Sequence, residues 1–230
     1  DLLSMVRTAM CVYHLILLNW YIFLNYYIPQ QGTIFRDGAQ SKYLTLLNLL
    51  LQAVFFGVAS LDDVLKKVKR KKDIKFVTAF RDLLFATLAF PICAFVFLVF
   101  WTIFLYNREL IYPKALDGVF PAWMNHAVHS FIFLFSLIEI FLRPHRYPSK
   151  KTGFALLAVG SLGYISRILW LHSVTGHWVY PVLAKLSSVG LAAFFFLGYV
   201  LTASLFVLGE RLNHLKWACV HIVLSPEYKK

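Results

Sequence analysis

Cysteines and charged residues are scarce in this chain, and both shortages narrow the class of protein. Only three cysteines occur among the 230 residues, Cys11, Cys93 and Cys219, and none belongs to a C-x-x-C pair. Neither a disulfide framework nor a thiolate metal site is therefore expected, and each cysteine is interpreted as a free, buried thiol. Charged residues make up 15% of the chain and hydrophobic residues 60%. A soluble domain does not have this composition, so we expect an integral membrane protein.

Six apolar stretches follow one another along the chain, each about 20 residues long, the length that an α-helix needs to cross a bilayer. They lie near 9–28, 43–61, 83–105, 122–142, 153–172 and 188–209. The first stretch lacks a small-residue cleavage site, so we interpret it as a retained span and not as a signal peptide. No loop is long enough for a soluble domain. The sequence predicts one all-α polytopic membrane domain over residues 1–230.

Basic residues gather in alternate loops, which predicts the orientation of the spans. They are dense in the loop after the second span, counted from Lys66 to Arg81, after the fourth span and in the C-terminal tail, and sparse in the other loops. The positive-inside rule then places both termini in the cytosol. We interpret the basic run from Lys66 to Lys75 as a solvated loop near lipid headgroups. The net charge of +12 therefore indicates membrane topology, and no nucleic-acid partner is expected.

The polar residues at the heads of two spans are the candidates for chemistry. The fourth span begins with Asn125, His126 and His129, and Thr45 lies in the first turn of the second span. Both spans enter the membrane from the same side, so Thr45 and His129 should lie at a similar depth. Ionisable side chains at that depth are costly and usually functional. A hydroxyl beside an imidazole is the arrangement that nucleophilic catalysis requires.

Each of these residues also has a purely structural interpretation. A threonine in a membrane helix often bonds its own backbone or a neighbouring helix, which applies to Thr45. Asn48 and Gln52 share a helix face with Thr45 and can join helices through hydrogen bonds. His126 and His129 can be packed, hydrogen-bonded histidines.

Other classes of site remain open at this point. A metal or haem protein could use His126, His129 and His172, although H-x-x-H without carboxylates is a weak pattern for a metal. Neither a metal nor another cofactor is expected. Pro91 lies inside the third span, where it should kink the helix and free a carbonyl that neighbours must satisfy.

Several motifs resemble the androgen-induced gene 1 protein family. They include Lys-Tyr-Leu-Thr at 42–45, Trp-Met-Asn-His-Ala-Val-His at 123–129 and Trp-Val-Tyr-Pro at 178–181. Three further blocks lie at 20–27, 80–85 and 110–114, so the resemblance covers nearly the whole chain.

The resemblance implies a multi-pass threonine hydrolase that cleaves fatty acid esters of hydroxy fatty acids. The threonine of the family motif matches Thr45, and its catalytic histidine matches His129. The resemblance further implies a link to tissue factor pathway inhibitor and anticoagulant activity, which nothing in the residues themselves indicates. The cell membrane is the expected location, with the endoplasmic reticulum as the alternative.

The chemistry of such a site requires further groups. No acidic residue lies at the depth of His129, so any third member is an amide, a backbone carbonyl or water. The side chains considered as oxyanion or supporting groups are Asn48, Asn125 and His126. Arg167, inside the fifth span, is the candidate partner for the carboxylate of a lipid substrate that enters from the bilayer. A non-catalytic membrane protein that binds lipids or other partners is the alternative, and the sequence does not indicate an oligomeric state.

Overall fold

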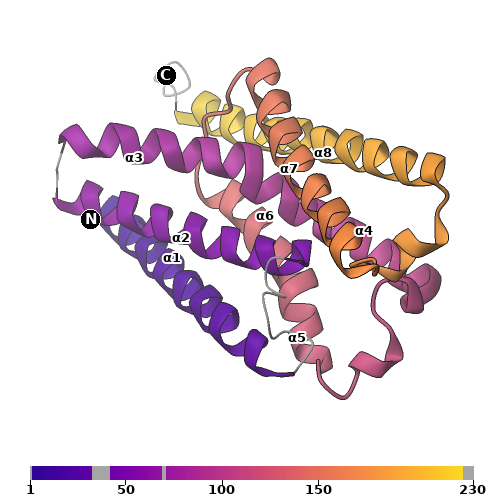
Figure 1. Ribbon diagram of the computed structural model, residues 1–230. Coiled ribbons are helices and arrows are strands. Elements are labelled where there is room, and N and C mark those ends of the chain that lie inside the picture. Colours follow the sequence, from indigo (N-terminus) through magenta and orange to yellow (C-terminus); the bar gives the residue numbers. More distant parts are fainter. Residues whose placement is uncertain (1, 33–41, 69–70, 225–230) are drawn as a thin grey trace.

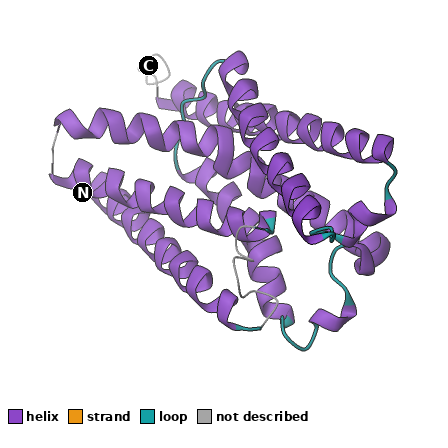
Figure 2. Ribbon diagram, viewed as in Figure 1, coloured by secondary structure: helices purple, strands orange, loops and turns teal. Residues whose placement is uncertain are grey.

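A computed structural model gives the fold of residues 2–32, 42–68 and 71–224, with side chains described for 4–32, 42–68 and 74–218 (Figure 1). All regular structure in these residues is helical (Figure 2). The eight α-helices are α1 Leu2–Tyr27, α2 Leu44–Val68, α3 Lys71–Leu84, α4 Phe90–Asn107, α5 Ala122–His126, α6 Ile132–Leu142, α7 Lys150–Thr175 and α8 Ser188–Leu224.

Six helical segments in the described residues are long and apolar enough to cross a membrane. Two of these segments are composite. The third joins α3 and α4 through a π-helical turn at Phe85–Ala89, and the fourth joins α5 and α6 through a π-helical turn at Ala127–Phe131. The predicted all-α, six-span membrane protein is confirmed, while the cytosolic position of the termini stays a prediction.

Most of the helices extend beyond the predicted spans, because helical hydrogen bonds continue where hydropathy falls. The largest difference between the predicted and the observed helices lies after the second span. The predicted loop from Lys66 to Lys75 is wrong where the structure describes it, because residues 66–68 end α2 and residues 71–75 begin α3, which continues into the third span. Arg81, counted with that basic region, is 3% exposed and pairs with carboxylates. An amphipathic helix escapes a search for apolar runs because only one of its faces is buried.

Pro91 lies directly after the first π-helical turn, so the predicted disruption takes the form of a widened turn. A π turn is a common way to insert a residue into a membrane helix where the hydrogen-bond ladder is interrupted. The side-chain amide of Gln52 donates to the Ala89 carbonyl at 3.0 Å and so satisfies a carbonyl of this turn from the neighbouring helix. Gln52 therefore joins α2 to the third span.

The helices pack closely at one end of the bundle and separate toward the other. Helix α1 packs along α2, and α8 packs on both α4 and α7 (Figure 1). A Cβ atom added to Gly153 of α7 would lie 2.4 Å from the Phe206 ring of α8, so this contact requires glycine. A Cβ atom added to Gly160, two turns further along α7, would lie 3.8 Å from the Leu88 side chain. The space between α4, α7 and α8 thus widens along α7.

The two described cysteine side chains agree with the sequence interpretation. Cys11 and Cys93 are free and buried, with exposures of 7% and 0%. The side chain of Cys219 lies outside the described residues. Neither thiol is exposed enough to react readily, since oxidation and modification require access.

Candidate active site

The predicted pair of residues meets at the wide end of the bundle. Thr45 Oγ1, in the first turn of α2, lies 3.2 Å from Nε2 of His129. The other ring nitrogen of His129, Nδ1, is 2.7 Å from the side-chain oxygen of Asn125 and 3.0 Å from its backbone carbonyl. Both of these oxygens only accept hydrogen bonds, so Nδ1 carries a proton. The neutral ring therefore presents an unprotonated Nε2, which accepts a hydrogen bond from the Thr45 hydroxyl.

The orientation of the imidazole is fixed from two further directions. His129 lies within the π-helical turn of the fourth span, where the widened backbone changes the direction of its side chain. Its ring stacks on the ring of Phe100 in α4, with centroids 3.4 Å apart and planes inclined by 6°. The ring is 5% exposed. Burial and stacking hold the imidazole rigidly against Thr45.

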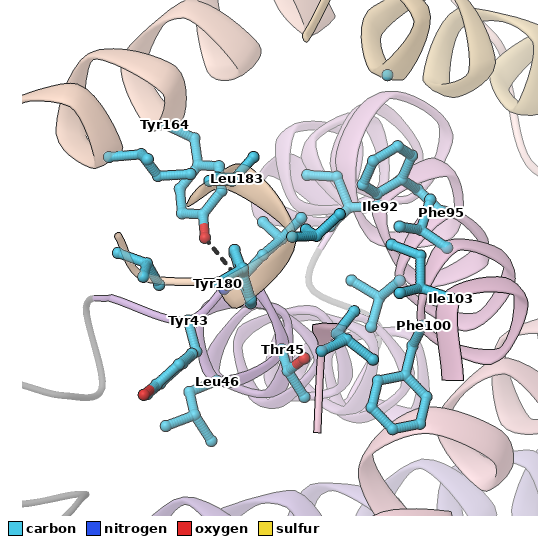
Figure 3. A pocket seen from close by; sticks show the side chains of 18 of the residues that line it. Tyr43, Thr45, Leu46, Ile92, Phe95, Phe100, Ile103, Tyr164, Tyr180 and Leu183 are labelled. Carbon is cyan, nitrogen blue, oxygen red and sulfur yellow. Dashed lines mark hydrogen bonds between the residues drawn. The ribbon is translucent and has the colours of Figure 1, made fainter. Parts of the chain in front are cut away.

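A cavity of about 480 Å³ begins at this pair. Thr45 and His129 are both part of its wall, which is otherwise built from α4, α7, α8 and the two loops around residues 111–120 and 178–183. Figure 3 shows Thr45 between α4 side chains, including Phe95 and Phe100, and the side chains of Tyr164 and Tyr180. The cavity has the size of a small-molecule site.

The cavity wall contains no Asp, Glu, Lys or Arg among the described residues. Its composition is mainly aliphatic and aromatic, and most of its hydroxyl groups are already bonded to the backbone. Tyr112 donates to the Phe120 carbonyl at 2.7 Å, and Tyr199 donates to the Phe154 carbonyl at 3.1 Å. The site is therefore suited to an uncharged, apolar ligand.

Two tyrosines of the wall fix the start of α2, and with it Thr45. The Tyr180 hydroxyl accepts the Leu44 amide at 2.8 Å and lies 3.0 Å from the Tyr164 hydroxyl, which donates to the Lys42 carbonyl at 2.9 Å. Burial raises the pKa of Tyr180 to about 12, so the phenol keeps its proton at neutral pH. This chain of hydrogen bonds connects the 178–183 loop and α7 to the residue before Thr45.

The structure separates the three supporting candidates. Asn125 contacts His129 directly, as described above. Asn48 is buried at 1% exposure and accepts a hydrogen bond from Gln52 at 3.1 Å, outside the cavity wall. His126 is exposed, lies 3.0 Å from the Ser130 hydroxyl and stacks on Trp101. Asn48 and His126 are thus not positioned at the Thr45 hydroxyl, and an oxyanion role for them stays a prediction without a contact.

Arg167 and His172 also lie outside the wall of the cavity. The guanidinium of Arg167 is 4.8 Å from the centre of the Trp170 ring, on the same helix. His172 stacks on Trp178, with centroids 3.9 Å apart. Within the described part of the chain, no group of three His, Cys, Asp or Glu side chains is arranged to hold a metal ion. The carboxylate role of Arg167 stays a prediction.

Sequence reasoning missed a second polar site near the opposite end of the bundle. It is a chain of alternating histidines and carboxylates, which we call the ionic cluster. His14 lies between Asp63, at 2.5 Å, and Glu139, at 2.8 Å. His145 lies between Asp82, at 3.0 Å, and Glu139, at 3.2 Å.

Two arginines complete the ionic cluster. Arg81 pairs with Asp62 and Asp82, and Arg143 pairs with Asp62 and Asp63. The carboxylate of Asp62 additionally accepts from Lys66 at 2.7 Å and from Thr78 at 2.5 Å. The available signals in the sequence were ionisable residues inside apolar stretches, His14 and Glu139. The residues of the cluster come from four helices, α1, α2, α3 and α6, and the loop after α6, so spacing alone could not identify them.

Comparison with known proteins agrees with this architecture. The family described as FAR-17a/AIG1-like protein matches residues 9–214. The human androgen-dependent TFPI-regulating protein is 64% identical over 219 residues, which cover 93% of this chain and 95% of that protein. The human androgen-induced gene 1 protein is 39% identical over 203 residues, 85% of each chain. No solved structure matches the chain. Because the family match extends over nearly all six spans, the chain belongs to the FAR-17a/AIG1-like family.

Proposed function

We propose that this protein is a membrane ester hydrolase in which Thr45 is the nucleophile and His129 the general base. The observation that carries the proposal is the directed hydrogen-bond chain from Thr45 through His129 to Asn125, at the wall of an apolar cavity. A threonine hydroxyl is a weak nucleophile until an adjacent base removes its proton, and the tautomer fixed by Asn125 leaves Nε2 ready to do so. Fatty acid esters of hydroxy fatty acids are the proposed substrates.

The reaction has two steps that use the same proton acceptor. The Thr45 Oγ1 atom attacks the ester carbonyl carbon while His129 Nε2 takes the hydroxyl proton. The bond from that carbon to the alkoxy oxygen then breaks, and His129 returns the proton to the leaving hydroxy acid. A water molecule, deprotonated in turn by His129, attacks the carbonyl carbon of the acyl-Thr45 ester. The bond from that carbon to Thr45 Oγ1 breaks, the fatty acid is released, and His129 Nε2 returns the proton to Oγ1.

Negative charge on the carbonyl oxygen requires hydrogen-bond donors during both steps. In the first turn of α2, the Leu44 amide donates to Tyr180 and the Leu46 and Leu47 amides donate to the Tyr43 carbonyl, while the helix dipole favours negative charge. We infer that the backbone amide of Thr45 itself, together with this dipole, stabilises the oxyanion in place of the three side chains considered from the sequence. Removing such a donor typically costs about 3 kcal/mol of transition-state stabilisation.

The cellular role is inferred from the names of the relatives. Relatives that are 60–64% identical carry a name that refers to regulation of tissue factor pathway inhibitor. We infer that this chain takes part in the same regulation, from the cell membrane, with the endoplasmic reticulum as the alternative location. The apolar cavity would equally suit a protein that binds a fatty acid without converting it.

Turnover by the purified protein distinguishes these functions. We expect Thr45→Ala and His129→Ala to lower hydrolysis of a fatty acid ester of a hydroxy fatty acid by roughly a thousandfold or more. Thr45→Ser is the matched control, because it keeps the hydroxyl, and it should retain measurable turnover. A fluorophosphonate probe should label the wild type and not Thr45→Ala. Undiminished turnover in either alanine variant would exclude this catalytic pair, and absence of turnover in the wild type would favour lipid binding.

A further inference from the structure

The cavity is lined by the catalytic pair and by a long stretch of α7. Along α7 its wall extends from Ile168 to Leu157, a rise of about 16 Å. This is about half the thickness of the hydrocarbon core, which two leaflets of lipid chains fill, so the cavity is about as long as one long acyl chain. Leu157 packs against the fully buried Phe206 and closes the deep end.

The charge of the wall decides which part of the substrate can occupy this cavity. An ester of a hydroxy fatty acid consists of an uncharged acyl chain and a hydroxy acid that carries a free carboxylate. No described wall residue is Lys or Arg, and burial of an unpaired carboxylate among apolar side chains is strongly unfavourable. The volume of about 480 Å³ is at the small end for ligand sites, which favours a single chain.

We propose that the cavity binds the acyl chain of the ester, with the hydroxy acid and its carboxylate outside, and that Gly160 sets the longest acyl chain accepted. This assignment rests on the proposed hydrolase function. After Thr45 Oγ1 has bonded to the acyl carbon, the bond to the alkoxy oxygen breaks and the hydroxy acid leaves with the proton from His129. The acyl chain stays in the cavity as the Thr45 ester until water releases it.

The position of Gly160 explains why this residue controls chain length. It lies about one turn after Leu157 on α7 and faces Leu88, in the π-helical turn before α4, across the cavity. A Cβ atom at Gly160 would be 3.8 Å from Leu88 Cδ2, so a larger side chain fits the backbone but fills the space beyond. Gly198 of α8, whose added Cβ would be 3.7 Å from the Phe95 ring, has the same role from the opposite wall.

Gly163 provides a matched control on the same helix. Gly163, like Gly160, is exposed, but it is not part of the cavity wall, and a Cβ added there would meet no atom within 4 Å. Gly160→Leu and Gly163→Leu therefore make the same chemical change on α7, with only the first inside the cavity. Gly198→Leu is the second cavity variant, in case Gly160→Leu does not fold.

The experiment measures kcat/KM for two series of esters in the purified protein. One series varies the acyl chain with a fixed hydroxy acid, and the other varies the hydroxy acid with a fixed acyl chain. We expect Gly160→Leu, or Gly198→Leu, to lower the ratio of long-chain to short-chain turnover by roughly tenfold or more in the acyl series, because methylenes are excluded from the cavity. In the hydroxy-acid series, the same variants should keep the wild-type ratio of long-chain to short-chain turnover. Gly163→Leu should keep the wild-type ratio in both series.

A loss that follows the length of the hydroxy acid would overturn the assignment, as would an acyl-chain profile equal to that of Gly163→Leu. Thr45→Ala, measured with the same esters, separates this failure from failure of the proposed function. If hydrolysis depends on Thr45 but not on Gly160 or Gly198, only the cavity assignment is wrong. If hydrolysis does not depend on Thr45, the proposed function itself is wrong.

Discussion

Two buried polar sites of the described bundle contain histidines, namely the ionic cluster and the pair formed by Thr45 and His129. They differ in the group at which their chains of hydrogen bonds end. Thr45 and Asp62 lie on the same helix, about 25 Å apart along its axis. In the ionic cluster, both nitrogens of His14 face carboxylates, and Arg143 pairs with one of them, Asp63. At Thr45, the chain of polar groups instead ends at a hydroxyl on the wall of a cavity.

The difference indicates separate roles for similar side chains. A buried group whose partners are all protein atoms holds helices together, because breaking any contact leaves a charge unpaired. A group that faces a cavity can transfer its proton to or from a ligand. The ionic cluster therefore joins helices, whereas Thr45 and His129 are positioned to react. Three variants test this comparison.

The largest effect is expected in the ionic cluster. Asp63→Ala leaves the guanidinium of Arg143 without one of its two carboxylate partners and removes the partner of His14 Nδ1. Thermal unfolding in detergent should show a loss of about 3–5 kcal/mol, the usual consequence of breaking a buried pair. Asp117→Ala is the control, because Asp117 is 56% exposed in its pair with Arg108 and should matter much less. Equal losses would contradict a structural role for the cluster.

An intermediate effect is expected at Asn125. Asn125→Ala removes the side-chain acceptor of His129 Nδ1, although the backbone carbonyl at 3.0 Å remains. Hydrolysis should fall by roughly tenfold to a hundredfold, as for other groups that orient a reactive side chain, while the unfolding temperature changes little. The neighbouring variant His126→Gln should lose much less activity, because His126 contacts Ser130 and not His129. Comparable losses in the two variants would argue against the orienting role.

The smallest effect is expected at Tyr180. Tyr180→Phe removes the acceptor of the Leu44 amide at the start of α2 and should destabilise the protein by about 1 kcal/mol. Turnover should fall modestly, because Thr45 directly follows Leu44, whose amide would lose its acceptor. Tyr106→Phe, at a position that is 84% exposed, is the control and should behave like the wild type. Wild-type stability and turnover in Tyr180→Phe would show that the start of α2 is held by other contacts.

The sequence predicted part of the site because depth in a membrane can be read along a helix. Thr45 and His129 each lie near the start of a span that enters from the same side, and the structure joins them at 3.2 Å. The supporting residues were only partly predictable. Asn125 was one of three candidates, and its selection over Asn48 and His126 depends on the directions in which these side chains point from α5 and α2.

The ionic cluster was not predicted, although all of its residues were visible. Arg81 was counted among the basic residues of the loop after the second span, and it lies 3% exposed between Asp62 and Asp82. Its helix begins in a polar segment, and hydropathy does not distinguish a polar loop from an amphipathic helix. Which charges pair is decided by helices that are distant in sequence.

The sequence by itself determined that the protein lies in a membrane, how many spans it has and which polar residues enter the bilayer. The length of each apolar run and the cost of burying a charge depend on neighbouring residues in the chain. The tertiary structure alone decided which polar residues meet. It closed α7 against α8 at Gly153 and left the cavity open at Gly160, because packing depends on the shapes of side chains from different helices. That difference in packing places an apolar cavity beside Thr45 and His129.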